Sequence, residues 1–343
     1  MSSKDIQAKF FQLVKERIDP NISFVDELAD MLELSTDSAY RRMRGETSLT
    51  FEELALLSKR FNISVDSLME SETNELTFQF QPLKEDGFNF IEYLKYIEQN
   101  MKLIEAEEDK EVIYIANEIP LFHLLYVPEV ASFKLFFWQK TILDFSQFRD
   151  QRFKLGKVDE QVNELSRSLR DLYCRIPSTE IYHSETVDTT LKQIEYYFDS
   201  GYFEVREEAM HLLNKVEVLV KHIRNQCEVG YKFKQQEDGQ APEFTGYRKQ
   251  DNYTVFHNDV LHTDNTILVR LGSRYLSFLT SNGISSLSTM NEKFYHESVR
   301  AISVLKRRAT LISGTSEKER NRVFENYFRK IERLRARLDS QLA

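Results

Sequence analysis

The segment from Ser23 to Leu68 constrains the fold of this chain more than any other part of the sequence. Ser23 is a favourable helix N-cap, and the apolar residues that follow it are spaced for one helical face. The turn Glu33–Ser35 separates this helix from a second one, Thr36–Arg44, which carries three arginines. Gly45 ends the second helix, because glycine readily adopts the left-handed conformation that closes a helix. The segment therefore predicts two short helices joined by a tight turn.

Helices on either side complete a predicted N-terminal domain over residues 1–70. A first helix is expected from Lys4 to Ile18, where apolar residues recur at helical spacing. Thr50 and Glu53 have the spacing of a capping box, which predicts the start of a further helix. Ser64 is a plausible cap for another short helix. The N-terminal domain is therefore expected to hold five helices.

The charge of the chain does not suggest a general nucleic-acid binder. The net charge is -9, and the first 70 residues hold 9 Lys and Arg against 13 Asp and Glu. The basic residues are concentrated, however, since Arg41, Arg42 and Arg44 lie within four positions. An acidic protein can bind DNA through a basic contact face, but its non-specific affinity should be weak. Dimerisation would help such a protein to bind.

The segment Ser23–Leu68 resembles the helix-turn-helix domain of the phage-repressor type, the Cro/XRE family. The resemblance rests on Glu27-Leu28-Ala29, Leu34-Ser35, Arg44-Gly45-Glu46, Leu54, Leu57 and the closing residues Ile63–Leu68. It covers 46 residues and spans the predicted helices of the domain. The resemblance implies that the helix Thr36–Arg44 enters the major groove of DNA.

The resemblance also implies roles for individual side chains. The candidates that face the bases are Thr36, Asp37, Tyr40 and Arg41, and an arginine in this position can bond guanine through two hydrogen bonds. Asp37 departs from the family, whose members often carry glutamine there; it either accepts from a cytosine amine or caps the helix. The candidates for phosphate contacts are Arg42, Arg44, Ser48, Thr50 and Lys59. The alternative is a helix-turn-helix that is used only for protein contacts.

The fold class expected for the whole chain is mainly α, with the five-helix domain, a helical middle region and a small α+β unit at the C-terminus. Residues 71–87 are expected to be a linker or edge strand, 88–230 a helical dimerisation or effector region, and 231–252 a surface loop. In the α+β region 253–343, the pattern predicts three strands and two helices: Tyr253–His257, Thr266–Arg270, Tyr275–Leu279, Asn291–Ile312 and a last helix from Ser316.

Two apolar patterns in the C-terminal regions permit more than one interpretation. In the aromatic stretch from Ile119 to Trp138, four residues either line an effector pocket or fill a core or dimer interface: Phe122, Tyr126, Phe136 and Trp138. On the last helix, a stripe at helical spacing either pairs two copies or packs on its own domain: Phe324, Tyr327, Ile331, Leu334 and Leu338.

No motif in the sequence predicts catalysis, a metal site or a cofactor. The seven histidines have no metal-ligand spacing with cysteine, and the common phosphate-binding and nucleophile motifs are missing from the sequence. Cys174 and Cys227 are too few for a disulfide framework and favour a reducing compartment. The stretch Ile119–Trp138 is interrupted by charges and prolines, so no membrane span is expected. The charged N-terminus does not resemble a signal peptide, and a cytoplasmic location is expected.

These features together predict a non-enzymatic transcription regulator that binds a double-stranded DNA operator as a homodimer. The large C-terminal part would dimerise the chain and sense a small-molecule or protein effector. A second hypothesis is a protein-interaction or antitoxin-like module in which the helix-turn-helix head is secondary. A third is an enzyme fused to a DNA-binding head, and the missing motifs argue against it.

Overall fold

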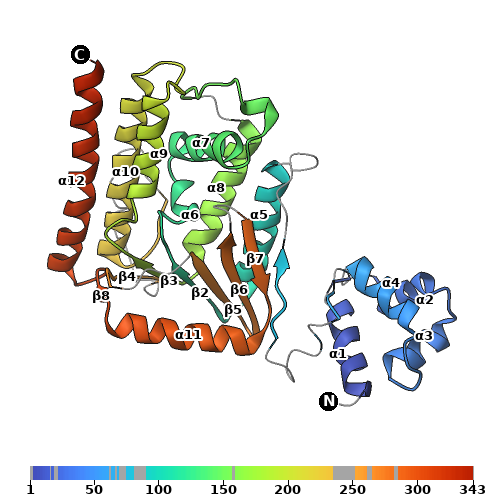
Figure 1. Cartoon of the computed structure of the whole chain (residues 1–343). Coiled ribbons are helices and arrows are strands. Elements are labelled where there is room, and N and C mark those ends of the chain that lie inside the picture. The colour runs from blue at the N-terminus through green and yellow to red at the C-terminus, as the bar shows by residue number, and fades with distance from the viewer. Residues whose placement is uncertain are drawn as a thin grey trace. The chain divides into compact units, whose positions relative to one another are not determined.

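The chain divides into two compact units, Met1–Phe78 and Gln79–Ala343, in a computed structural model (Figure 1). The structure describes residues 3–15, 17–18, 22–61, 63–65, 68, 75–80, 90–156, 159–234, 252–260, 265–281 and 285–342.

The N-terminal unit is built from four described helices: α1 (Ser3–Lys15), α2 (Phe24–Met31), α3 (Thr36–Met43) and α4 (Phe51–Phe61). Their apolar faces meet in one core, in which Phe10, Leu28 and Leu57 are almost completely buried. The capping box that was predicted for α4 is confirmed, because the Thr50 amide donates to Glu53 and the Glu53 amide donates to Thr50. Most of the predicted fifth helix lies outside the described residues.

The C-terminal unit combines helices with one mixed sheet. Its helical segments are α5 (Phe90–Ala106), α6 (Leu121–Leu124), α7 (Pro128–Phe137), η2 (Trp138–Ile142), η3 (Ser146–Phe148), α8 (Glu160–Arg175), α9 (Asp188–Asp199), α10 (Glu208–Val229), α11 (Glu292–Arg307) and α12 (Glu317–Leu342). Its strands are β1 (Gln79–Phe80), β2 (Lys110–Ile115), β3 (Ser178–Tyr182), β4 (Tyr253–His257), β5 (Thr266–Leu271), β6 (Arg274–Ser281), β7 (Ser285–Thr289) and β8 (Thr310–Leu311).

The sheet has the strand order β1-β7-β6-β5-β2-β3-β4-β8. Strands β2, β3 and β4 are parallel to one another, whereas the pairs that involve β1, β5, β6, β7 or β8 are antiparallel. Parallel neighbours need long crossovers, and the helices α6 to α10 lie in the two connections from β2 to β3 and from β3 to β4. The antiparallel part is a meander whose first hairpin turns at Gly272.

Helices cover both faces of the central strands. In Figure 1, α11 runs along one face of the sheet, and helices α5 to α10 lie on the other. Side chains alternate between the faces along a strand, so Ile113 and Ile115 contribute to the core under α11, while Val112 and Tyr114 join the larger core. A strand with apolar side chains on both faces reads in the sequence as a continuous apolar run rather than an alternating one.

The expectation of a helical middle region, separate from an α+β unit at the C-terminus, is wrong. Strands β2 and β3 arise from the middle region, and they pair with β5 and β4 from the C-terminal region. Residues 88–230 and 253–343 therefore share one sheet and one compact unit. The pairing joins segments that lie far apart along the chain, so no local pattern revealed it.

The end of the chain also differs in detail from the prediction. The helix expected over Asn291–Ile312 ends at Arg307, and the strand β8 follows it and pairs with β4. The apolar stripe of α12 is buried inside its own unit, and α12 packs against α10. For example, Tyr327 is 1 % exposed and Ile331 is 0 % exposed. The stripe is therefore occupied by the chain itself and does not offer a surface to a second copy.

The aromatic stretch that permitted two interpretations forms part of the larger core. Phe122, Tyr126 and Trp138 are buried there, and Phe136 packs against the same cluster. The four side chains pack against aromatic residues of four different helices, α8, α10, α9 and α5 in that order, so they do not line an open pocket as a set.

Candidate functional site

The turn between α2 and α3 brings the two helices together. Glu33 adopts φ 54°, which is uncommon for a residue other than glycine. This conformation reverses the chain directly after α2, and the Leu34 amide then donates to the Ala29 carbonyl at 2.9 Å. Ser35 caps α3, because its side chain accepts a hydrogen bond from the Ser38 amide. The structure therefore contains the helix-turn-helix geometry that the sequence predicted.

The four candidates for base contacts are all exposed on α3: Thr36, Asp37, Tyr40 and Arg41. Ala39 on the opposite side is fully buried against the core of the unit. The side chain of Arg41 is 56 % exposed, and Tyr40 is 48 % exposed although it is a large aromatic residue. The capping hydrogen bond belongs to Ser35, so Asp37 is not needed as the cap and stands in the first turn, where a carboxylate is favoured by the helix dipole.

The candidates for phosphate contacts fall into different environments. Arg44, Ser48, Thr50 and Lys59 are exposed. Ser48 and Thr50 lie in the segment between α3 and α4, whereas Lys59 is near the other end of α4, about 13 Å further along the helix axis at 1.5 Å per residue. Arg44, Ser48 and Thr50 therefore lie close together between α3 and α4, and Lys59 lies apart from them near the end of α4.

Arg42 differs from the other phosphate candidates because it is engaged inside the unit. Its Nη2 lies 2.8 Å from Glu53 Oε1, its Nε donates to Glu53 Oε2 at 3.0 Å, and its side chain is only 15 % exposed. Burial alone would raise the pKa of Glu53, but hydrogen bonds from Arg42 and the Thr50 amide outweigh it and hold the pKa below its usual value. The pair joins the end of α3 to the start of α4, so we assign Arg42 a structural position instead of a phosphate contact.

Glu46 lies beside the two exposed arginines of this region. Its carboxylate is 3.2 Å from Nε of Arg44 and 3.9 Å from Nε of Arg41. All three side chains are about half exposed, so water screens these ion pairs and they are weak. A phosphate group can therefore compete with Glu46 for the arginines.

Gln7 of α1 supports the segment that follows α3, although no motif in the sequence singles it out. Its Nε2 donates to the carbonyls of Arg42 and Thr47 at 2.7 and 2.9 Å, and its Oε1 accepts from the Leu49 amide at 3.0 Å. Gln7 is only 9 % exposed. The sequence signal for its role is a glutamine on the apolar face of a predicted helix, because a buried amide group needs hydrogen-bond partners.

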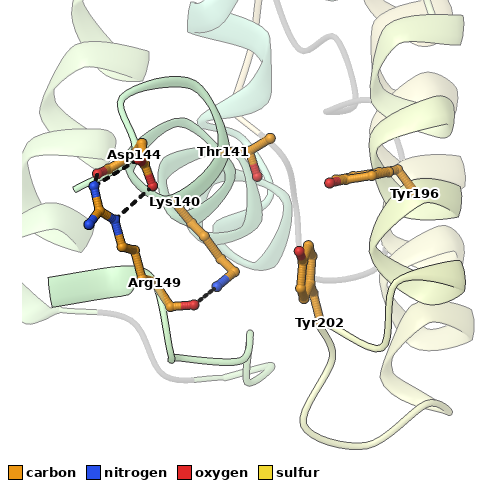
Figure 2. Close-up of a pocket in the computed structure, with 6 residues that line it drawn as sticks. All are labelled: Lys140, Thr141, Asp144, Arg149, Tyr196 and Tyr202. Carbon is orange, nitrogen blue, oxygen red and sulfur yellow. Dashed lines mark hydrogen bonds and ion pairs between the residues drawn. The ribbon is translucent and has the colours of Figure 1, made fainter. Parts of the chain in front are cut away.

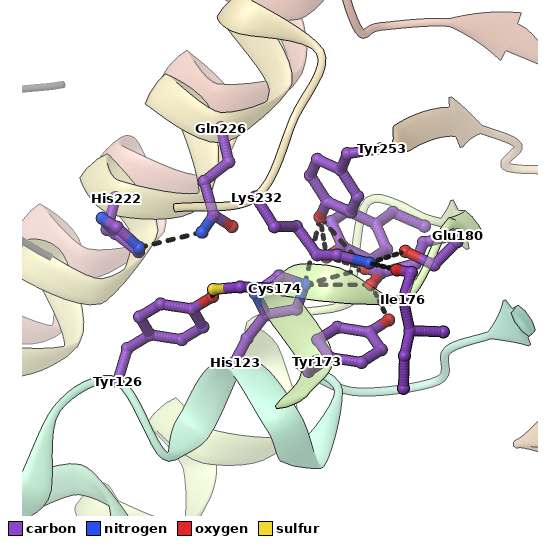
Figure 3. Close-up of polar contacts among 12 residues, drawn as sticks. His123, Tyr126, Tyr173, Cys174, Ile176, Glu180, His222, Gln226, Lys232 and Tyr253 are labelled. Atoms are coloured by element: carbon purple, nitrogen blue, oxygen red, sulfur yellow. Dashed lines mark hydrogen bonds and ion pairs between the residues drawn. The ribbon is translucent and has the colours of Figure 1, made fainter. Parts of the chain in front are cut away.

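The C-terminal unit contains a buried polar cluster around Glu180 of β3 (Figure 3). The Glu180 carboxylate accepts hydrogen bonds from Tyr173, from Tyr182 at 2.5 Å and from Tyr253 at 3.1 Å, and it lies 3.0 Å from Nε2 of His123. Burial alone would raise the pKa of Glu180, but His123 and the tyrosine hydroxyls outweigh it and lower the pKa to about 2. The carboxylate is therefore ionised and fully hydrogen-bonded inside the core.

Lys232 is a second buried ionisable group in this region (Figure 3). Its Nζ donates to the Ile176 carbonyl at 2.6 Å and to Ser178 Oγ at 2.5 Å, and it lies 4.0 Å from the centre of the Tyr173 ring. Burial lowers the pKa of Lys232 to about 7. Because Glu180 and Lys232 are 0 % and 4 % exposed, we interpret them as groups that hold the sheet and its helices together.

The described residues contain no cluster of His, Cys, Asp or Glu side chains that could hold a metal ion. Among the same residues, no helix has both the length and the apolar character needed to cross a membrane.

Comparison with known protein families identifies the N-terminal unit. Residues 12–83 match the BetR domain, a helix-turn-helix-type DNA-binding domain. The match covers about a fifth of the chain and includes α2, the turn, α3 and α4. Searches of curated proteins and of solved structures found no match for the chain. The site on α3 therefore belongs to a DNA-binding domain of the helix-turn-helix type.

Proposed function

We propose that this chain is a sequence-specific transcription regulator of the Cro/XRE type whose N-terminal unit binds an operator in double-stranded DNA. The observation that carries the proposal is the exposed face of α3. This face holds Thr36, Asp37, Tyr40 and Arg41, and Ser35 caps the start of the helix. These side chains include donors, an acceptor and an apolar ring, which are the groups that read base edges in the major groove. The match of this unit to the BetR domain supports DNA as the partner.

Within this proposal, Arg41 is the principal base-reading residue. Its position on the outer face of α3 suits a pair of hydrogen bonds to guanine. Arg44, Ser48, Thr50 and Lys59 contact phosphates and set the position of α3 in the groove. Arg42 acts indirectly, because its ion pair with Glu53 fixes α4 against α3.

We propose further that the protein binds as a homodimer in the cytoplasm and has no enzymatic activity of its own. Two heads on an inverted repeat would compensate for the weak non-specific attraction of an acidic protein to DNA. The C-terminal unit, which is much larger than the head, supplies the dimer contact and the sensory role. Two free cysteines, Cys174 and Cys227, are compatible with a reducing compartment. Sedimentation of the full-length chain tests the dimer directly.

Selection of bound duplexes from a randomised pool tests the proposed function. The full-length chain and the Arg41→Ala variant are compared at two salt concentrations, with Arg300→Ala as the matched control. Arg300 is also an exposed arginine, with a side chain 80 % exposed, but it lies on α11 of the other unit. We expect a palindromic motif for the wild type and the control, and a loss of about 1–3 kcal/mol with relaxed specificity for Arg41→Ala.

Two outcomes would contradict the proposal. Equal losses on every sequence for Arg41→Ala would remove Arg41 as a base-reading residue. No enrichment of any sequence by the wild type would favour the second candidate function, a protein-interaction or antitoxin-like module. Exposed apolar residues on α4 support that candidate, since Phe51 is 82 % exposed and Leu56 is 48 % exposed. A stoichiometric protein that copurifies with the chain would support it further.

A further inference from the structure

A polar pocket opens between η2, the segment after it and α9 in the C-terminal unit (Figure 2). Its volume is about 210 Å³, and it is lined by Lys140, Thr141, Asp144, Arg149, Tyr196 and Tyr202. Pockets for drug-sized ligands are larger, so this one suits a molecule of only several non-hydrogen atoms. The lining residues do not include the four aromatic residues that the sequence offered for an effector pocket, which are Phe122, Tyr126, Phe136 and Trp138.

Lys140 supplies a fixed positive charge in this pocket. The residue is 9 % exposed, and its Nζ donates to the carbonyls of Phe148, at 3.0 Å, and Arg149. The ammonium also lies 4.7 Å from the centre of the Tyr202 ring. These contacts hold the charge in one place, and an ammonium group has a third N–H donor beyond the two that the carbonyls accept.

Hydroxyl groups line the pocket opposite Lys140. In Figure 2, the hydroxyls of Tyr196 and Tyr202 point toward the space beside Thr141. The hydrogen bond between the two tyrosines raises the pKa of Tyr202. Thr141 Oγ1 lies 2.9 Å from the hydroxyl of Tyr197. The pocket therefore combines one fixed cation with several hydroxyl groups.

The remaining charges of the pocket limit the ligand to a small negative charge. Arg149 and Asp144 form an ion pair, with Nη2 2.8 Å from Oδ2 and Nε donating to Oδ1 at 3.1 Å. Together with Lys140 the lining has a formal charge of plus one, which matches a monoanion. A single net positive charge neutralises a monoanion, whereas a dianionic phosphate would keep one uncompensated negative charge beside Asp144. The hydrogen bond from Arg149 lowers the pKa of Asp144.

The backbone around the pocket has two unusual features. Lys140 and Thr141 lie on η2, a π-helical turn, and such turns frequently occur at functional sites. Asp144 adopts φ 49°, a conformation that costs free energy for a residue other than glycine. Behind the pocket, the ring of Tyr197 packs against Phe137, with centroids 5.3 Å apart.

We infer that this pocket binds a small monocarboxylate that carries a hydroxyl or keto group beside the carboxylate. The carboxylate accepts from Lys140 and from a tyrosine hydroxyl, and the neighbouring oxygen of the ligand bonds the second hydroxyl. If the chain regulates transcription as proposed above, this pocket is its effector site. The binding test below contains no DNA, so its outcome does not depend on the proposed function.

The test measures binding to the full-length chain by titration calorimetry at constant ionic strength. The probes are lactate and pyruvate, with lactamide as a neutral molecule of the same shape and inorganic phosphate as a dianion. The variants are Tyr196→Phe and Lys140→Met, with Lys154→Met as the matched control. Lys154 is 56 % exposed and pairs with Glu204 outside the pocket. Tyr196 is 46 % exposed, so Tyr196→Phe should fold even where Lys140→Met does not.

We expect lactate or pyruvate to bind with a dissociation constant of about 1 mM, because so few atoms can contribute only a small binding free energy. Tyr196→Phe should weaken binding about 5- to 10-fold, the usual effect of one hydrogen bond. Lys140→Met should abolish binding, and Lys154→Met should leave it unchanged. The inference is overturned if neither carboxylate binds at about twenty times that concentration. Equal binding of lactamide, tighter binding of phosphate, or an unchanged affinity in Tyr196→Phe would overturn it as well.

Discussion

Gln7 is the residue whose replacement tests the structure of the DNA-binding head most directly. The Gln7→Ala variant removes three hydrogen bonds that the side chain makes to Arg42, Thr47 and Leu49. Each such bond contributes about 1 kcal/mol net, and buried backbone groups left without a partner add to the cost. We therefore expect the variant to lose about 3 kcal/mol of local stability in the segment between α3 and α4.

The measurement is amide hydrogen exchange in the full-length chain. Two compact units need not unfold together, so one melting temperature would not report on the head alone. A loss of about 3 kcal/mol corresponds to roughly 100-fold faster exchange, because 1.4 kcal/mol is a factor of ten. The Leu49 amide should show the largest change, since it donates directly to Gln7.

Gln12→Ala is the matched control for this prediction. Gln12 lies on the same helix, undergoes the same chemical change and is exposed. It should leave the exchange of Leu49 within about twofold of the wild type. Gln7→Glu is a second informative variant, because a carboxylate can still accept from Leu49 but cannot donate to the two carbonyls. Equal exchange at Leu49 in Gln7→Ala and Gln12→Ala would refute the reasoning.

Three further predictions concern single charged residues. Glu33→Gly should stabilise the head by roughly 0.5–1 kcal/mol, because the strain removed from the left-handed backbone exceeds the entropic cost of glycine. Faster amide exchange in α2 and α3 than in the wild type would contradict this. Glu46→Gln should raise the affinity for DNA of any sequence about two- to fivefold at low salt, because Arg41 and Arg44 lose a competing partner. Fluorescence anisotropy on random duplexes measures this affinity, and an unchanged value would count against contacts between these arginines and DNA. The Glu180 carboxylate has a pKa of about 2 in the folded chain, below its usual 4.5, so its contribution to stability is complete above about pH 4.5 and is lost as the pH falls toward 2. Calorimetric melting of the C-terminal unit should therefore fall over that range in the wild type, and Glu180→Gln should be less stable at pH 7 and lack this component; identical pH profiles for the two proteins would contradict the prediction.

Much of the N-terminal unit could be predicted from the sequence because its determinants are local. A cap such as Ser35 and a capping box such as Thr50 with Glu53 act within three residues, so the sequence order itself records them. Apolar spacing on a short helix also identifies which side is buried, and the structure places Ala39 in the core. The resemblance to the Cro/XRE family supplied the outward residues of α3, and all four are exposed.

Contacts between distant segments decided the remaining features of the head. Nothing within the run Arg41, Arg42 and Arg44 distinguishes the middle arginine, and only the fold sets it against Glu53 of α4. In the same way, Gln7 meets the segment after α3 across 35 to 42 positions of sequence. Pairings of this kind depend on how helices cross, which single residues do not encode.

The same distinction between local and long-range determinants holds for the C-terminal unit. Long helices such as α5 and the hairpin of β5 and β6 were predictable, because periodicity and a glycine turn specify them locally. The sequence by itself thus determined most helices, the caps of α3 and α4, and the buried side of α3. Ser23 precedes α2 as predicted, but its side chain makes no capping hydrogen bond. Only the tertiary structure joined β2 and β3 to the later strands, gathered tyrosines around Glu180 and placed Lys140 opposite Tyr196. Hydrogen bonds between strands and convergence of polar side chains act between parts of the chain that are remote in sequence, and their free energy becomes available only after the chain has folded.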